Sequence, residues 1–220
     1  MNIRSTVVFI FIFGLIISSL TVYADEHVVC FDDESKQTTI QELVGIIIEY
    51  KSNSAGDIDA FDLKLEDKVI TILFMPHSAN ALMAIAEKGT KVKVKVEFNE
   101  NHNHYSLSNL ENTLNSKRLD ITCQYPSWTN NTGSDQSILF AQHYFITDRK
   151  GRIAGIANGK TLAIFKPNSV NNLIELIKSN SKVKITGPER PKDKGYVNTK
   201  FDLIIYTTSI EIDGTTFLLK

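Results

Sequence analysis

One segment of 21 residues occurs twice in this sequence, and this repeat constrains the fold more than any other feature. Residues 74–94 read FMPHSANALMAIAEKGTKVKV, and residues 165–185 read FKPNSVNNLIELIKSNSKVKI. The two copies align without a gap at an offset of 91 residues, with proline, serine, asparagine, leucine and a Lys-Val-Lys triplet at equivalent positions. A fixed offset indicates a duplicated supersecondary unit. We therefore expect two halves of one architecture; the alternative is two unrelated strand–helix–strand units.

Each part of the first copy predicts a local structure. A strand runs into Phe74, and the proline two residues later ends it. Ser78 is expected to cap a helix, because its hydroxyl can accept an amide of the first turn. The helix is predicted to end at Lys88, with Gly89 as the left-handed residue that follows. The alternating residues 91–98 then predict a strand with one buried face.

The second copy predicts the same order of elements. Its helix is expected over about residues 170–179, and Asn180 stands where the first copy has glycine. Asparagine is the residue that tolerates the left-handed conformation best after glycine. Residues 182–186 then predict the strand.

The N-terminus predicts a secreted or periplasmic protein. Residues 1–24 have the pattern of a signal peptide, with Arg4 before an apolar run and a small-residue cleavage site that ends at Ala24. The alternative, a transmembrane anchor, would need a span of about 20 apolar residues. Cys30 and Cys123 are expected to form a disulfide in an oxidising compartment, and a nucleophilic thiol is the alternative.

The mature chain divides into two predicted domains. Residues 25–123 form the first, residues 124–136 a linker rich in turn-forming residues, and residues 137–220 the second. Each domain reads as three strands, a helix and two strands, and then a further strand. That order resembles the oligonucleotide/oligosaccharide-binding fold, a small five-stranded Greek-key barrel found in bacterial envelope and secreted proteins.

The resemblance rests on topology and transfers no functional residues. It implies a mainly β protein with one helix per repeat, folded as two tandem barrels of this type. The alternative fold is a pair of α+β domains with open antiparallel sheets.

The charge of the chain is divided unequally between the halves. Residues 25–115 carry 16 acidic and 8 basic side chains, a net charge of −8, whereas residues 116–220 carry 9 acidic and 15 basic side chains, a net charge of +6. In the resembling fold, the loop between the two late strands borders the usual ligand face. Basic residues around this loop predict a site for an anionic glycan, lipid headgroup or nucleic acid: Lys182, Lys184, Arg190, Lys192, Lys194 and Lys200. The alternatives are a solvated loop, or electrostatic docking of one half on the other.

These features favour a non-catalytic secreted or periplasmic binding protein with an anionic ligand or a partner protein. No catalytic residue, metal ligand or cofactor is assigned. A His-x-His pair at residues 102–104 resembles metal ligands, but an exposed polar turn is the preferred interpretation. Two alternatives remain open, a metal-dependent nuclease or phosphodiesterase on the same scaffold and an adaptor of an envelope or secretion machine.

Overall fold

The computed structural model describes residues 38–100, 103–121, 134–166, 169–170, 172–178 and 181–219. The predicted signal peptide, both cysteines and most of the predicted linker lie outside these residues, so the disulfide and the cleavage site stay predictions. Within the described residues, none of the helices is long and apolar enough to cross a membrane.

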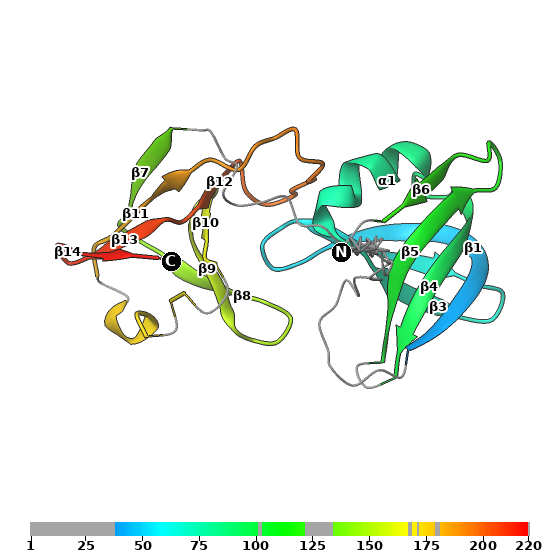
Figure 1. Ribbon diagram of the computed structural model, residues 1–220, viewed down its shortest axis with the longest axis horizontal. Coiled ribbons are helices and arrows are strands. Elements are labelled where there is room, and N and C mark those ends of the chain that lie inside the picture. Colours follow the sequence, from blue (N-terminus) through cyan, green and yellow to red (C-terminus); the bar gives the residue numbers. More distant parts are fainter. Residues whose placement is uncertain are drawn as a thin grey trace, which may run out of the picture.

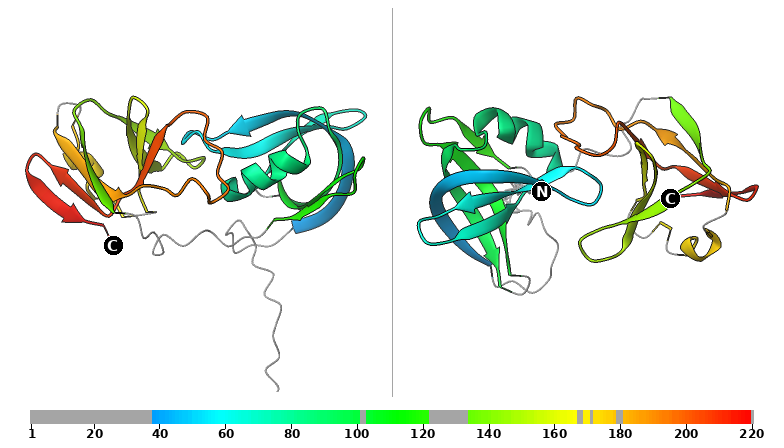
Figure 2. Two further views of the ribbon diagram at one scale, coloured as in Figure 1. Left: turned by 90° about the horizontal axis from the view of Figure 1, so that it is seen from above. Right: turned by 180° about the vertical axis from the view of Figure 1, so that it is seen from behind.

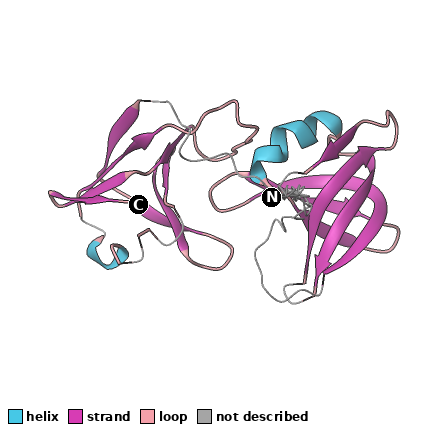
Figure 3. Ribbon diagram, in the orientation of Figure 1, coloured by secondary structure: helices cyan, strands magenta, loops and turns pink. Residues whose placement is uncertain are grey.

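The described chain is mainly β, and its strands form several antiparallel sheets (Figures 1 and 3). The first half contains a six-stranded sheet in the order β3-β2-β1-β4-β5-β6. Its strands are β1 (Thr38–Ser52), β2 (Ile58–Lys64), β3 (Val69–Leu73), β4 (Lys91–Asn99), β5 (His104–Asn112) and β6 (Arg118–Asp120).

The pairings of the first half return to the strand from which they start. β3 pairs not only with β2 but also, in parallel, with β5 through Ile72–Tyr105 and Leu73–Ser106. The sequence of paired strands is therefore β1-β2-β3-β5-β4-β1. The fifteen-residue β1 pairs with β4 through residues 38–46 and with β2 through residues 46–52.

The second half repeats these pairings with two of its strands interrupted. β8–β9 and β9–β10 are antiparallel, β10–β12 is parallel, and β11 lies between β7 and β13. β7 and β8 together take the place of β1, and β12 and β13 together take the place of β5. These strands are β7 (Asp135–Phe140), β8 (Tyr144–Thr147), β9 (Ile153–Asn158), β10 (Thr161–Ile164), β11 (Val183–Pro188), β12 (Leu203–Tyr206), β13 (Ser209–Ile212) and β14 (Thr215–Leu218).

Both copies of the repeated segment lie in the same topological context. Each follows a strand that has an antiparallel and a parallel neighbour, β3 in one half and β10 in the other. Each leads into the strand that pairs with the first strand of its half, β4 or β11. The expectation of two halves with one strand order is thus met at the level of strand pairing.

The helices differ from the prediction in both halves. A 3₁₀ turn η1 (Pro76–Ser78) precedes α1 (Ala79–Ile85), so Ser78 does stand at the N-cap position of α1, but the expected capping bond from its side chain is not made. The helix ends at Ile85, not at Lys88, although Gly89 does have a positive φ of 91°.

The early end of α1 has a tertiary cause. The side-chain amide of Asn112 donates to the carbonyl of Ile85 at 2.7 Å, and the Tyr50 hydroxyl donates to the carbonyl of Ala86. Side chains from β5 and β1 thereby satisfy carbonyls that a longer helix would have used. In the second half, the described residues of the predicted α-helix form only a 3₁₀ helix, η3 (Ile174–Leu176), so one α-helix per repeat is wrong.

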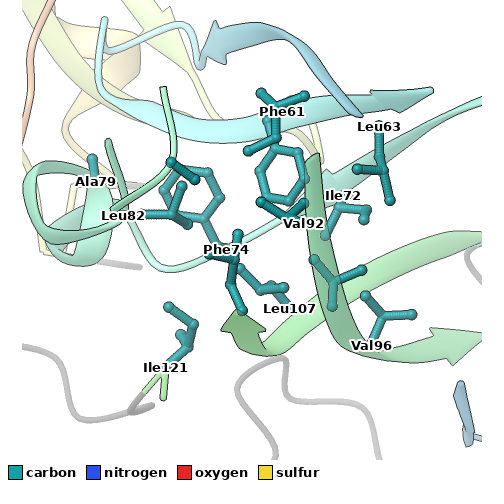
Figure 4. Packing of buried hydrophobic residues seen from close by; sticks show 14 of the residues in the cluster. Phe61, Leu63, Ile72, Phe74, Ala79, Leu82, Val92, Val96, Leu107 and Ile121 are labelled. Atoms are coloured by element: carbon teal, nitrogen blue, oxygen red, sulfur yellow. The ribbon is translucent and has the colours of Figure 1, made fainter. Parts of the chain in front are cut away.

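Each half has an apolar core. In the first half, side chains from β2, β3, β4, β5 and α1 converge, with Phe61, Leu63 and Leu82 fully buried (Figure 4). A second cluster around Phe140 and Ile185 fills the space among β7, β10, β11 and β13. The two halves lie side by side along the long axis of the molecule (Figure 2).

Candidate functional site

The loop between β11 and β12, residues 189–202, is much longer than its equivalent in the first half. The equivalent connection in the first half, between β4 and β5, covers only residues 100–103. Regular strand begins again only at Leu203. The extra residues instead extend toward the first half and contact its β1–β2 turn and α1 (Figure 1).

Backbone hydrogen bonds join this loop to the first half. The amide of Ile58 donates to the carbonyl of Val197 at 2.9 Å, and the amide of Thr199 donates to the carbonyl of Gly56 at 2.8 Å. Asp57 and Asn198 thus form an isolated antiparallel bridge at the start of β2. The carbonyl of Gly195 accepts the amide of Asn80 at 2.9 Å and so satisfies an amide in the first turn of α1.

A buried ion pair lies at the centre of this contact. Both terminal nitrogens of Arg190 donate to the two carboxylate oxygens of Asp57, each at 2.8 Å. Their side chains are only 7% and 6% exposed. The Asn198 side-chain amide donates to the same carboxylate at 2.8 Å, and the guanidinium lies 4.3 Å from the centre of the Tyr196 ring. Bidentate geometry and a third donor are what a buried ion pair needs to offset its desolvation.

A second arginine crosses between the halves nearby. Arg149, from the β8–β9 turn, donates to the carboxylate of Asp59 at 2.6 Å, and the amide of Asn53 donates to the other oxygen at 3.2 Å. Burial raises the pKa of Asp59, and the arginine only partly opposes this effect. The Ser54 hydroxyl donates to the carbonyl of Thr147 beside this pair.

Apolar contacts accompany the polar ones. Val197 packs against the core of the first half, and Ala55 packs against a small cluster in the second half that includes Phe201. The backbone approach is also close: a Cβ on Gly195, which has a φ of 80°, would lie 2.0 Å from the carbonyl oxygen of His77. Glycine is therefore required at this position both by φ and by space.

The six basic residues predicted as a ligand site occupy three environments. Arg190 is buried in the ion pair, and Lys200 donates to the carbonyls of Asn53 and Ser54 at 3.3 and 3.4 Å. Lys182 and Lys184 have exposed side chains at and beside the start of β11, the latter 3.6 Å from Glu211.

Lys192 and Lys194 are the exposed pair at the crest of the 189–202 loop. The Lys192 side chain is 84% exposed, and its only described partner is Glu189 at 3.9 Å. Lys194 is also exposed. A shallow pocket borders the crest, lined in part by Tyr196, Phe201 and Asp202.

Sequence reasoning did not identify the residues that receive the loop. No motif in the sequence marks Asp57, Asp59, Asn198 or Arg149. The opposite net charges of the halves did indicate that the halves attract each other, since both ion pairs join an acidic residue of the first half to an arginine of the second. Among the described residues there is no group of three or more His, Cys, Asp or Glu side chains arranged to hold a metal ion. Of the His-x-His pair, His102 lies outside the described residues and His104 begins β5.

Comparison of the chain with protein-family models, with curated proteins and with solved structures finds no match.

Proposed function

We propose that this protein is a non-catalytic binding protein of the cell envelope or cell exterior, built from two modules of the oligonucleotide/oligosaccharide-binding type. The observation that supports this fold is the order of strand pairing, β1-β2-β3-β5-β4-β1, with a helix between β3 and β4. The equivalent pairings in the second half support a second module. In this type of fold, the loops after the first and fourth strands border the ligand face.

The anchored 189–202 loop is the observation that carries the binding proposal. Arg190 fixes one side of the crest to Asp57, and the residues from Val197 to Thr199 fix the other side to the first half. Lys192 and Lys194 therefore stand on a loop whose two ends are held. Because the loop is ordered before binding, contact with an anionic ligand costs less conformational entropy than it would on a free loop.

The ligand class is one that presents phosphate, sulfate or carboxylate groups, since lysine ammonium groups are general partners for such anions. Reversal of both crest charges, Lys192→Glu with Lys194→Glu, is expected to weaken binding strongly and to remove most of its salt dependence. The matched control is Lys166→Glu with Lys178→Glu, which makes the same change of net charge at two other exposed lysines of the second half.

Three probes distinguish the sources of the anion: heparin, vesicles of phosphatidylcholine with phosphatidylglycerol, and a single-stranded DNA oligonucleotide. The proposal requires that at least one probe binds the natural protein and the control equally, and the crest variant much more weakly. Equal binding by the crest variant, or no binding of any probe, contradicts it. The nuclease hypothesis makes a different prediction, nicking of plasmid DNA that depends on calcium or magnesium.

A further inference from the structure

The last strand, β14, forms an edge of a four-stranded sheet in the order β14-β13-β11-β7. It lies at the end of the molecule remote from the first half in each view (Figures 1 and 2). Thr215 and Thr216 are exposed, and Leu218 is 76% exposed. Within the described residues, β14 is paired only with β13.

The hydrogen bonds of β14 show which of its backbone groups face outward. The amide of Leu219 donates to the carbonyl of Thr208 at 2.8 Å, toward β13. Backbone groups along a strand alternate between its two sides, so Phe217 also faces β13. Thr216 and Leu218 consequently direct both N–H and C=O away from the sheet.

The equivalent edge in the first half is protected, whereas β14 is not. β6 has only three residues, and two of them, Arg118 and Asp120, are charged. β14 has four residues, TTFL, with no charge and no proline. Short length, charge and proline are the devices by which proteins prevent an edge strand from pairing further. β6 and β14 occupy equivalent places in the two halves, and only β14 lacks these devices. The shared strand order therefore does not by itself require an unprotected edge strand.

We propose that β14 is a self-association edge, which pairs antiparallel with β14 of a second copy of this chain about a two-fold axis. If the axis passes beside Phe217, then Thr216 of each copy faces Leu218 of the other. Each such pair exchanges two backbone hydrogen bonds, so the contact contains four. The sheet of the second half would continue across the axis as a single eight-stranded sheet.

A second copy fits this edge because the edge is self-complementary. The two residues with outward backbone groups flank Phe217 symmetrically, so one register pairs all of them. An isologous contact places identical side chains near the axis, and like charges there would oppose it. β14 has none, and Glu211 on the neighbouring strand already lies 3.6 Å from Lys184. This inference uses residues remote from the 189–202 loop and does not depend on the proposed function.

The test is the molar mass of the protein by light scattering during size-exclusion chromatography, over roughly a hundredfold range of concentration. The natural protein is expected to be a dimer at the upper end of the range, dissociating on dilution, since a strand edge is a small interface. Thr216→Pro removes two of the four hydrogen bonds without affecting those to β13, and Leu218→Glu places two negative charges at the axis. Each is expected to raise the dimer dissociation constant at least about tenfold.

Leu176→Glu is the control, because it adds a charge at an exposed leucine outside this edge. Far-UV circular dichroism identifies a variant that fails to fold, and two variants of different chemistry keep the test decisive. The proposal is overturned if the natural protein is a monomer at every concentration. It is also overturned if Thr216→Pro and Leu218→Glu both dimerise as strongly as the natural protein.

Discussion

Replacement of Arg190 by methionine tests whether the ion pair with Asp57 holds the two halves together. Methionine keeps much of the volume but leaves a carboxylate that is only 6% exposed without its cation. Removal of one partner of a buried ion pair costs about 3–5 kcal/mol. The Asn198 amide, which still donates to Asp57, places the expected cost at the lower end of that range.

Hydrogen exchange of two amides reports this cost at the contact itself. Ile58 and Thr199 each donate a backbone hydrogen bond across the halves, so their exchange requires the halves to separate or unfold. A loss of about 3 kcal/mol corresponds to a fall of roughly two orders of magnitude in their protection. Amides within β4, which pair only inside the first half, should keep their protection.

Two further variants separate the ion pair from other effects. Arg190→Met combined with Asp57→Leu removes both charges and is expected to recover much of the lost protection, because an apolar pair often replaces a buried ion pair at little cost. Lys192→Met, at a side chain that is 84% exposed, should change nothing measurable. If Arg190→Met leaves the exchange of Ile58 and Thr199 unaltered, the ion pair does not hold the halves together and the reasoning fails.

Three other substitutions test separate parts of the structure by urea unfolding. Gly195→Ala should destabilise the contact by about 1–3 kcal/mol, because the added Cβ would lie 2.0 Å from the carbonyl oxygen of His77. Gly151→Ala is the control and should cost less, because Gly151 also has a positive φ but its Cβ would have no atom within 4 Å. Leu82→Ala, in the core of the first half, should cost about 2–5 kcal/mol. Burial raises the pKa of Asp62, but hydrogen bonds from a lysine and a threonine outweigh burial, so the pKa is lowered in the folded state. The natural protein should therefore be more stable to unfolding than Asp62→Asn above about pH 4, and this difference in stability should disappear as the pH falls further.

The positions of several strands could be predicted from the sequence because they depend on local signals that recur. Alternation of apolar residues identified β4 and β11, and Gly89 was correctly expected to be left-handed. The helix ends could not be predicted in the same way. The end of α1 is set by side chains of Tyr50 and Asn112, which are distant in the sequence.

The contact between the halves was only partly predictable. The unequal charge predicts attraction between the halves, and docking of one half on the other is among the alternatives for the basic loop. The individual partners were not predictable, because Asp57 and Arg190 are 133 positions apart and neither belongs to a motif. In the second half, the described residues of the helix predicted over 170–179 form only the 3₁₀ helix η3.

The charges at the contact also predict how it responds to acid, and the prediction is opposite to the usual one for an ion pair. Burial raises the pKa of Asp59 despite its contact with Arg149, so the folded state binds the proton more tightly than the unfolded state does. The stability contributed by this proton is therefore fully present below the unfolded pKa and is lost as the pH rises through the folded pKa. Relative to Asp59→Asn, the natural protein should gain stability as the pH falls from 7 through the titration of this carboxyl. Urea unfolding of both proteins across that range measures the difference, and a natural protein that loses stability relative to the variant would show that the attraction of Arg149 outweighs burial.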